Sequence, residues 1–120
     1  MSEVRFLVEM VSGVPVVVTP EEIDITNAAG LRAALLEAAG RGPRRLVVDM
    51  SRTQFCDTAG IHALVEAHKR AGARGGEVRL VITGAAVLRI FAITGLDSVI
   101  PYFASLEDAL TATPRSADGT

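Results

Sequence analysis

The sequence of 120 residues lacks several features that would place it in a specialised class of protein. Its single cysteine, Cys56, excludes an internal disulfide framework and a zinc cage built from cysteines. Its 12 basic residues do not outnumber its 14 acidic residues, which argues against a general binder of nucleic acid or of anionic membranes. The longest uncharged run, Met10 to Pro20, is too short to span a bilayer, and charge interrupts the apolar stretch of Met1 to Glu9, unlike a signal peptide. We therefore expect a cytoplasmic protein.

The composition that remains is that of an ordinary globular domain. Apolar residues make up 49% of the chain and charged residues 22%, which excludes disorder throughout. A chain of this length forms one domain. We expect that domain to cover residues 1–112, followed by a flexible C-terminal tail over residues 113–120, which are small and polar.

Periodicity along the chain predicts alternating strands and helices. Residues 4–10 and 14–19 read as strands joined by a Ser12-Gly13 turn, with Pro15 at the start of its strand or on an edge. Further on, the expected strands are 46–48, 78–82 and 99–103, the expected helices are 28–40, 59–72, 87–94 and a short one capped by Ser105, and 51–57 is a polar loop. The fold class is therefore α/β: a mixed, mostly parallel β-sheet with an N-terminal hairpin and about four helices.

Functional residues in such sheets gather where strands end and helices begin. Two segments qualify, Glu22-Ile23-Asp24 and Asp57-Thr58-Ala59-Gly60. Thr58 is placed to cap its helix, and Gly60 would allow another part of the backbone to approach closely. An alternative interpretation is that the Thr58 hydroxyl is exposed at a helix N-terminus, where backbone amides and the helix dipole would favour a phosphate.

These segments resemble the STAS domain, and within that group the bacterial anti-sigma factor antagonists. The central likeness is a strand ending in Val48-Asp49-Met50, followed by the turn Asp57-Thr58-Ala59-Gly60-Ile61. In the family this turn reads Asp-Ser-Ser/Ala-Gly-Leu/Ile, and Thr58 stands at the position of its phosphoacceptor serine. The other matching segments are Glu22-Ile23-Asp24 with Asn27-Ala28, Val87 to Phe91, Thr94-Gly95-Leu96 and Ser105 to Leu110. The chain departs from the family pattern at Glu21, where the family has glycine.

The resemblance implies a regulatory binding protein without catalytic residues, cofactor or metal. An anti-sigma factor with serine/threonine kinase activity would bind the unphosphorylated form, so that a sigma factor is released. Phosphorylation of Thr58 would end that binding, and a phosphatase would restore it. The expected partner-binding residues are Asp24, Asp57, Thr58, Ala59, Gly60 and His62. We expect a monomer or weak dimer with no direct contact to nucleic acid or membrane.

Other functions compete with this one. The chain could instead be a STAS subunit of a stress-signalling or lipid-transport assembly, or a small enzyme that uses the loop from Cys56 to Thr58. Against the enzyme, the sequence places no nucleophile, base and acid together, and a structural role for Cys56 is favoured. His62 and Glu66 follow Thr58 at one-turn intervals and either position a partner or form a solvated helix flank.

Overall fold

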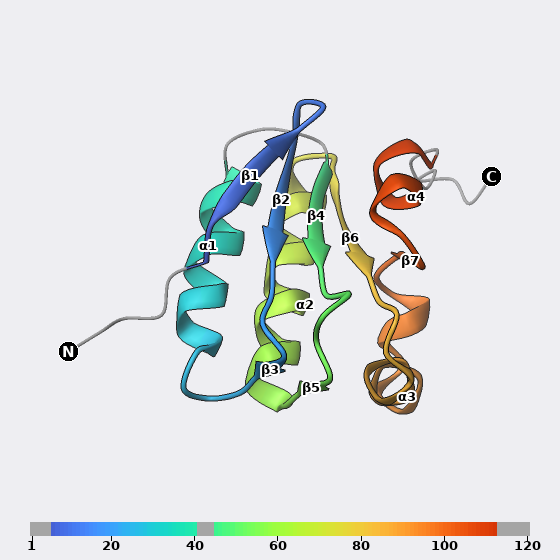
Figure 1. Cartoon of the computed structure of the whole chain (residues 1–120). Coiled ribbons are helices and arrows are strands. Elements are labelled where there is room, and N and C mark those ends of the chain that lie inside the picture. Colours follow the sequence, from blue (N-terminus) through green and yellow to red (C-terminus); the bar gives the residue numbers. More distant parts are fainter. Residues whose placement is uncertain (1–5, 41–44, 113–120) are drawn as a thin grey trace.

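The computed structural model describes residues 6–40 and 45–112 and confirms the α/β fold (Figure 1). The expected tail, residues 113–120, lies outside the described residues. In chain order the elements are β1 (Val8–Val11), β2 (Val14–Val18), β3 (Glu22–Ile23), α1 (Ala28–Gly40), β4 (Arg45–Asp49), β5 (Phe55–Cys56), α2 (Thr58–Ala73), β6 (Glu77–Val81), α3 (Ala85–Thr94), the 3-10 helix η1 (Leu96–Ser98), β7 (Tyr102–Phe103) and α4 (Leu106–Thr111).

The main sheet has five strands in the order β1-β2-β4-β6-β7. The first two strands form the predicted antiparallel hairpin, in which Ser12 and Gly13 both have positive φ angles, 52° and 80°. All later neighbours pair in parallel, with Val17 opposite Val48 and Val48 opposite Leu80. The parallel ladder between β2 and β4 begins at Val16, one residue after Pro15. The missing backbone N–H of Pro15 therefore removes no hydrogen bond from that ladder.

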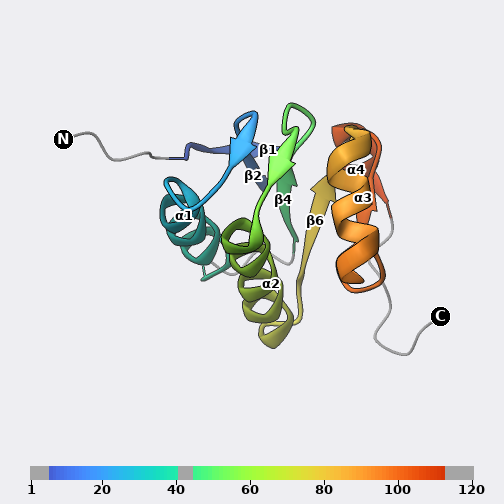
Figure 2. The same ribbon diagram turned by 90° about the horizontal axis from the view of Figure 1, so that it is seen from below.

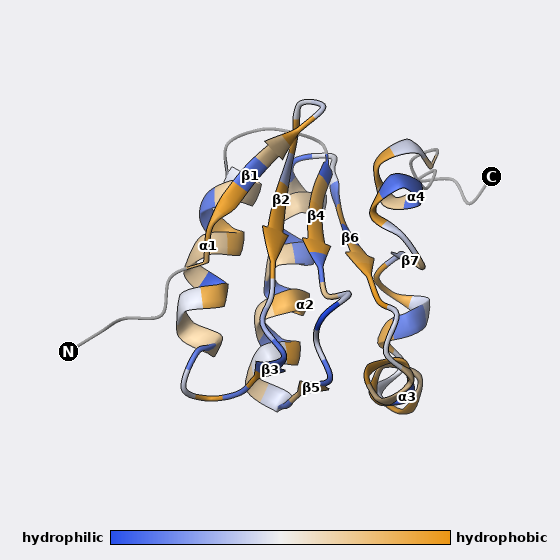
Figure 3. Ribbon diagram, viewed as in Figure 1, coloured by the Kyte–Doolittle hydropathy of each residue, from blue (hydrophilic) through white to orange (hydrophobic). Residues whose placement is uncertain are grey.

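Helices cover the sheet unequally. Helices α1, α2 and α3 bury their apolar residues in one large cluster with one face of the sheet, and Figure 2 shows α1 and α2 side by side there. The other face carries a smaller cluster, in which Val16, Val47 and Val81 pack with Ala109 of α4. Strand β2 is apolar along its whole length, whereas β4 and β6 combine an apolar stretch with charged residues (Figure 3).

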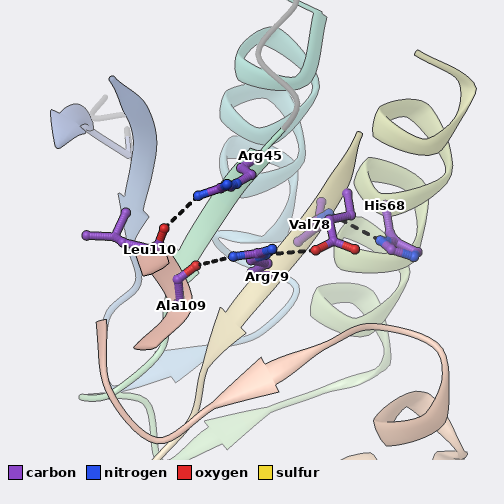
Figure 4. Close-up of polar contacts among 7 residues, drawn as sticks. Arg45, His68, Val78, Arg79, Ala109 and Leu110 are labelled. Atoms are coloured by element: carbon purple, nitrogen blue, oxygen red, sulfur yellow. Dashed lines mark hydrogen bonds and ion pairs between the residues drawn. The ribbon is translucent and has the colours of Figure 1, made fainter. Parts of the chain in front are cut away.

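Two arginines attach α4 to its face of the sheet (Figure 4). Arg79 of β6 is completely buried; its Nη1 donates to the carbonyl of Ala109 at 2.7 Å, and its Nε pairs with Glu77 at 2.7 Å. Arg45 of β4 donates to the carbonyl of Leu110 at 2.6 Å. Both arginines thus satisfy carbonyls in the last turn of a six-residue helix, where cations are favoured.

Three local predictions need revision. The expected loop 51–57 contains a short strand, β5, which pairs with β3 in a second sheet. The expected strand 99–103 is only Tyr102–Phe103 and follows η1. The first strand begins at Val8, although residue 6 onward is described. The predicted cap of the last helix is confirmed, because Ser105 Oγ accepts from the Asp108 amide at 3.1 Å.

Candidate functional site

The small sheet of β3 and β5 brings the two segments singled out in the sequence together. Glu22 lies opposite Phe55 and Ile23 opposite Cys56, in parallel. The Asp57 amide then donates to the Ile23 carbonyl at 3.0 Å, which continues the pairing to the start of α2. The helix starts of α1 and α2 therefore lie at the same end of the molecule, beside β3 and β5 (Figure 1).

A buried pair of threonines holds this end of the chain in place. Thr53 Oγ1 donates to the carbonyl of Pro20 at 2.6 Å and lies 2.6 Å from Thr19 Oγ1. Because the Thr53 proton goes to Pro20, Thr19 is the donor between the two hydroxyls, and its oxygen also lies 3.3 Å from a second acceptor, the Asp49 carbonyl. This short chain of hydrogen bonds fixes the loop after β4 against the connection between β2 and β3.

Helix α2 begins with a different cap from the predicted one. The cap residue is Asp57, whose Oδ1 accepts from the amides of Ala59 at 3.0 Å and Gly60 at 3.2 Å. Thr58 is the first residue of the helix and is exposed. Among the described residues nothing forms a hydrogen bond with its hydroxyl. The prediction that Thr58 caps the helix is therefore wrong, because the longer, charged side chain of Asp57 already takes both amides.

Gly60 lies behind this surface. It is buried, and a Cβ atom added to it would lie 2.6 Å from Ile23 Cγ2 and 2.7 Å from Cys56 Sγ. The close approach is to two side chains of the small sheet. The absence of a side chain at Gly60 lets the first turn of α2 rest directly on β3 and β5, so its part in the site is to position Thr58.

Asp24 stabilises the start of α1. Its carboxylate accepts from the hydroxyl and the amide of Thr26, and these hydrogen bonds lower the pKa of Asp24 below its ordinary value. Asn27 completes the turn, since its side chain accepts from the Asp24 amide at 3.0 Å and donates to the Glu22 carbonyl at 2.8 Å. The turn therefore holds a negative charge at the start of α1.

A shallow groove of about 370 Å³ runs between α1 and α2 from this end. It is lined by Ile25, Ala28, Ala29, Arg32, Ala59, His62, Ala63 and Glu66. Ile25 stands 80% exposed in the loop before α1. Arg32 and Glu66 close the groove with two hydrogen bonds, of 2.8 and 2.7 Å, which raise the pKa of Arg32 and lower that of Glu66.

Cys56 does not suit nucleophilic chemistry. It is 2% exposed, and burial together with the nearby charge of Asp57 raises the pKa of its thiol to about 12. At neutral pH it is therefore a thiol and not the reactive thiolate. Within residues 6–40 and 45–112, no group of three or more histidine, cysteine or acidic side chains is placed to hold a metal ion.

The predicted site residues lie mostly on the α2 side of this surface, with Asp24 alone on the α1 side. Five of the predicted site residues, Asp57 to Gly60 and His62, lie in the cap and first turns of α2. Ile25 and Arg32, which line the groove on the α1 side, were missed. The exposed apolar Ile25 between Asp24 and Thr26 was the sequence signal for this side, whereas the pairing of Arg32 with Glu66 joins residues 34 positions apart.

A family model for the STAS domain matches residues 5–109. The chain belongs to the STAS domain family. The anti-sigma-F factor antagonist RsfB of Mycobacterium tuberculosis is 32% identical to this STAS domain over 100 residues, which cover 83% of this chain and 81% of RsfB.

Solved structures of STAS proteins share its architecture. The crystal structure of an anti-sigma factor antagonist from Mycobacterium paratuberculosis superposes with a TM-score of 0.81 at 36% identity, covering 89% of this chain and 91% of the other. The Bacillus protein SpoIIAA in its phosphorylated form superposes with a TM-score of 0.69 at 22% identity, covering 88% and 96% of the two chains, and shows the shared fold. In the described part of this STAS domain, no helix is both long and apolar enough to cross a membrane.

Proposed function

We propose that the protein is an anti-sigma factor antagonist that works in the cytoplasm and is switched by phosphorylation of Thr58. Unphosphorylated, it binds an anti-sigma factor with serine/threonine kinase activity and so frees a sigma factor. The observation that carries this proposal is the position of Thr58: it is exposed in the first turn of α2, and Asp57 rather than Thr58 caps the helix. The names of the relatives RsfB and the Mycobacterium paratuberculosis antagonist support the same function.

The docking surface in this proposal surrounds Thr58. Asp24, Asp57, Ala59 and His62 contribute to it, together with the groove that Ile25 borders. Gly60 supports it from behind. Exposed apolar surface beside fixed charges is typical of the core and rim of a protein interface.

Phosphate transfer takes place in the complex. Thr58 Oγ1 forms a bond to the γ-phosphorus of ATP as the bond from that phosphorus to the bridging oxygen breaks. ADP leaves, and the hydroxyl proton passes to a base of the kinase. A separate phosphatase restores Thr58 by hydrolysis, and the antagonist itself performs no catalysis.

Electrostatic repulsion explains why the phosphorylated form would dissociate from the anti-sigma factor. Phosphorylation adds about 1.5 to 2 negative charges beside Asp57 and near Asp24. Like charges enclosed in an interface cost several kcal/mol, against about 8 kcal/mol for micromolar binding. The same phosphate is well tolerated by the folded antagonist, because it lies at the positive end of α2.

The test has two steps. Lysate of the source cell is passed over immobilised wild type, Thr58→Glu, and Thr111→Glu as a control with the same substitution on α4, across the sheet. Wild type and the control should retain one kinase of the anti-sigma type, identified by mass spectrometry, and Thr58→Glu should not. The purified kinase and ATP should then phosphorylate wild type but not Thr58→Ala, and phosphorylation should release the complex.

Other outcomes would reject the proposal. Retention of the same scaffold or transporter subunits by wild type and Thr58→Glu would assign the protein to a larger assembly. Phosphate incorporation into Thr58→Ala would place the acceptor elsewhere.

A further inference from the structure

One face of α2 carries a row of polar residues that begins at the phosphoacceptor. Thr58, His62, Glu66 and Arg70 follow at intervals of four residues, and all four are exposed. Residues at this spacing are neighbours on a helix surface, with about 5–6 Å between their Cβ atoms. The row therefore forms one continuous stripe from the first turn to the last part of the helix.

The far half of this stripe already contains one ion pair and a further cation. Glu66 binds Arg32 of α1 through two hydrogen bonds, of 2.8 and 2.7 Å. Arg70, four residues beyond Glu66, contributes to the lowering of the Glu66 pKa. The order of acid before base at this spacing is the favourable one, because it agrees with the helix dipole.

When Thr58 carries a phosphate, Thr58 and His62 in the near half have the same order of anion before cation as Glu66 and Arg70. The anion then stands four residues before His62, again in the favourable order, and the stripe alternates in charge from Thr58 to Arg70. We propose that the imidazolium ring of His62 binds the phosphate on Thr58 and holds it over the first turn of α2. This inference rests on the proposed function, since it concerns the phosphorylated form of the same site.

The other charged groups around His62 already have partners in the structure. Arg32 faces it from α1, but its guanidinium group is engaged by both oxygens of Glu66. Glu66, one turn further along α2, is paired in turn with Arg32. Asp57 accepts hydrogen bonds from amides of the first turn, and Asp24 accepts one from the amide of Thr26 in the loop before α1.

The pair makes the phosphorylated state dependent on pH. Histidine ordinarily takes up its proton near pH 6.5 and the phosphate loses its second proton near pH 6, so both are more than half in their charged forms only between about pH 6 and 6.5. As pH rises further, the ring loses its charge and the phosphate its partner. The phosphorylated surface then carries its full negative charge, which strengthens the repulsion of an acidic or closely packed partner surface.

The test uses protein with phosphothreonine installed at position 58 by genetic encoding, so that no kinase is needed. Ring protons of both histidines are followed by NMR over pH 5 to 8, with and without the phosphate. The phosphate should move the His62 titration to higher pH by about 0.2 to 0.4 unit. The internal control is His68, about 15 Å from Thr58 along the helix axis, whose titration should move much less.

Two variants separate the pair from a general effect of charge. In phosphorylated His62→Gln, the 31P titration of the phosphate should shift to higher pH than in wild type, because its cation is gone. His62→Arg should restore a low 31P titration without the histidine-dependent step. Equal shifts of His62 and His68, or identical 31P titrations in wild type and His62→Gln, would overturn the inference. Neither result would touch the proposed function, which depends on phosphorylation by the partner and release of the complex.

Discussion

Gly60 and Ile23 are packed so closely that the position of a Cβ atom at Gly60 lies 2.6 Å from Ile23 Cγ2. This contact joins the first turn of α2 to the small sheet of β3 and β5. It sets the position from which Thr58 is presented, because Thr58 lies two residues before Gly60 on the same turn.

Gly60→Ala should therefore destabilise the protein. Overpacking costs about 1–3 kcal/mol, only partly offset by about 1 kcal/mol of helix propensity. Gly72→Ala in the same helix is the matched control, since its Cβ would meet nothing within 4 Å, and it should stabilise. Urea denaturation of both variants measures the difference; equal effects would mean that the contact with Ile23 relaxes without cost.

The cap of α2 can be assigned by two alanine substitutions. Asp57→Ala should cost about 0.5–2 kcal/mol, because the amides of Ala59 and Gly60 lose their acceptor. Thr58→Ala should change stability by less than about 0.5 kcal/mol, as for an exposed surface residue. The free energy of unfolding from chemical denaturation decides between them. A larger loss for Thr58→Ala would return the capping role to Thr58.

Arg79 should matter far more to stability than Arg45. Arg79→Met leaves the partly buried side chain of Glu77 without its cation and the Ala109 carbonyl without a donor, a loss of about 3 kcal/mol. Arg45→Met removes one partly buried hydrogen bond to Leu110, worth about 1 kcal/mol. Hydrogen exchange should show early opening of α4 in Arg79→Met. Unchanged protection of the α4 amides would show that apolar packing alone holds this helix.

The pair of Arg32 and Glu66 predicts a pH dependence of stability. The pKa of Glu66 is lowered in the folded protein from its ordinary value of 4.5, so the pair stabilises above that pH and is lost as pH falls through the lower folded value. Arg32→Gln should thus be less stable than wild type at neutral pH, and the stabilities of the two proteins should converge in acid. Arg89→Gln, an exposed arginine on α3, is the control and should track wild type throughout. The midpoint of urea denaturation across the acid range gives the comparison.

Cys56 should react only when the structure opens. Its thiol is 2% exposed and its pKa is raised to about 12, so iodoacetamide at mildly alkaline pH should modify the folded protein far more slowly than the protein in urea. Mass spectrometry over time measures both rates. Rapid modification of the folded protein would mean that β5 separates readily from α2.

Much of the site was predictable because its signals are local. The alternation of strands and helices determined the α/β class, and the turn from Asp57 to Gly60 located the segment that we propose to accept the phosphate. Which residue caps α2 was not predictable, because Asp57 and Thr58 are both good capping residues and only the backbone path chooses between them. Strand β5 was missed, since a two-residue strand has no periodicity to detect.

The sequence by itself determined the order of the longer helices and strands, the single domain and the spacing of Thr58, His62, Glu66 and Arg70 on one helix, since all of these follow from local pattern and helix geometry. Tertiary structure alone decided what lies opposite them. It paired β3 with β5, placed Ile25 and Arg32 beside α2, and buried Arg79 under α4. Such contacts join residues far apart in the chain and depend on how the layers pack, which no local pattern encodes.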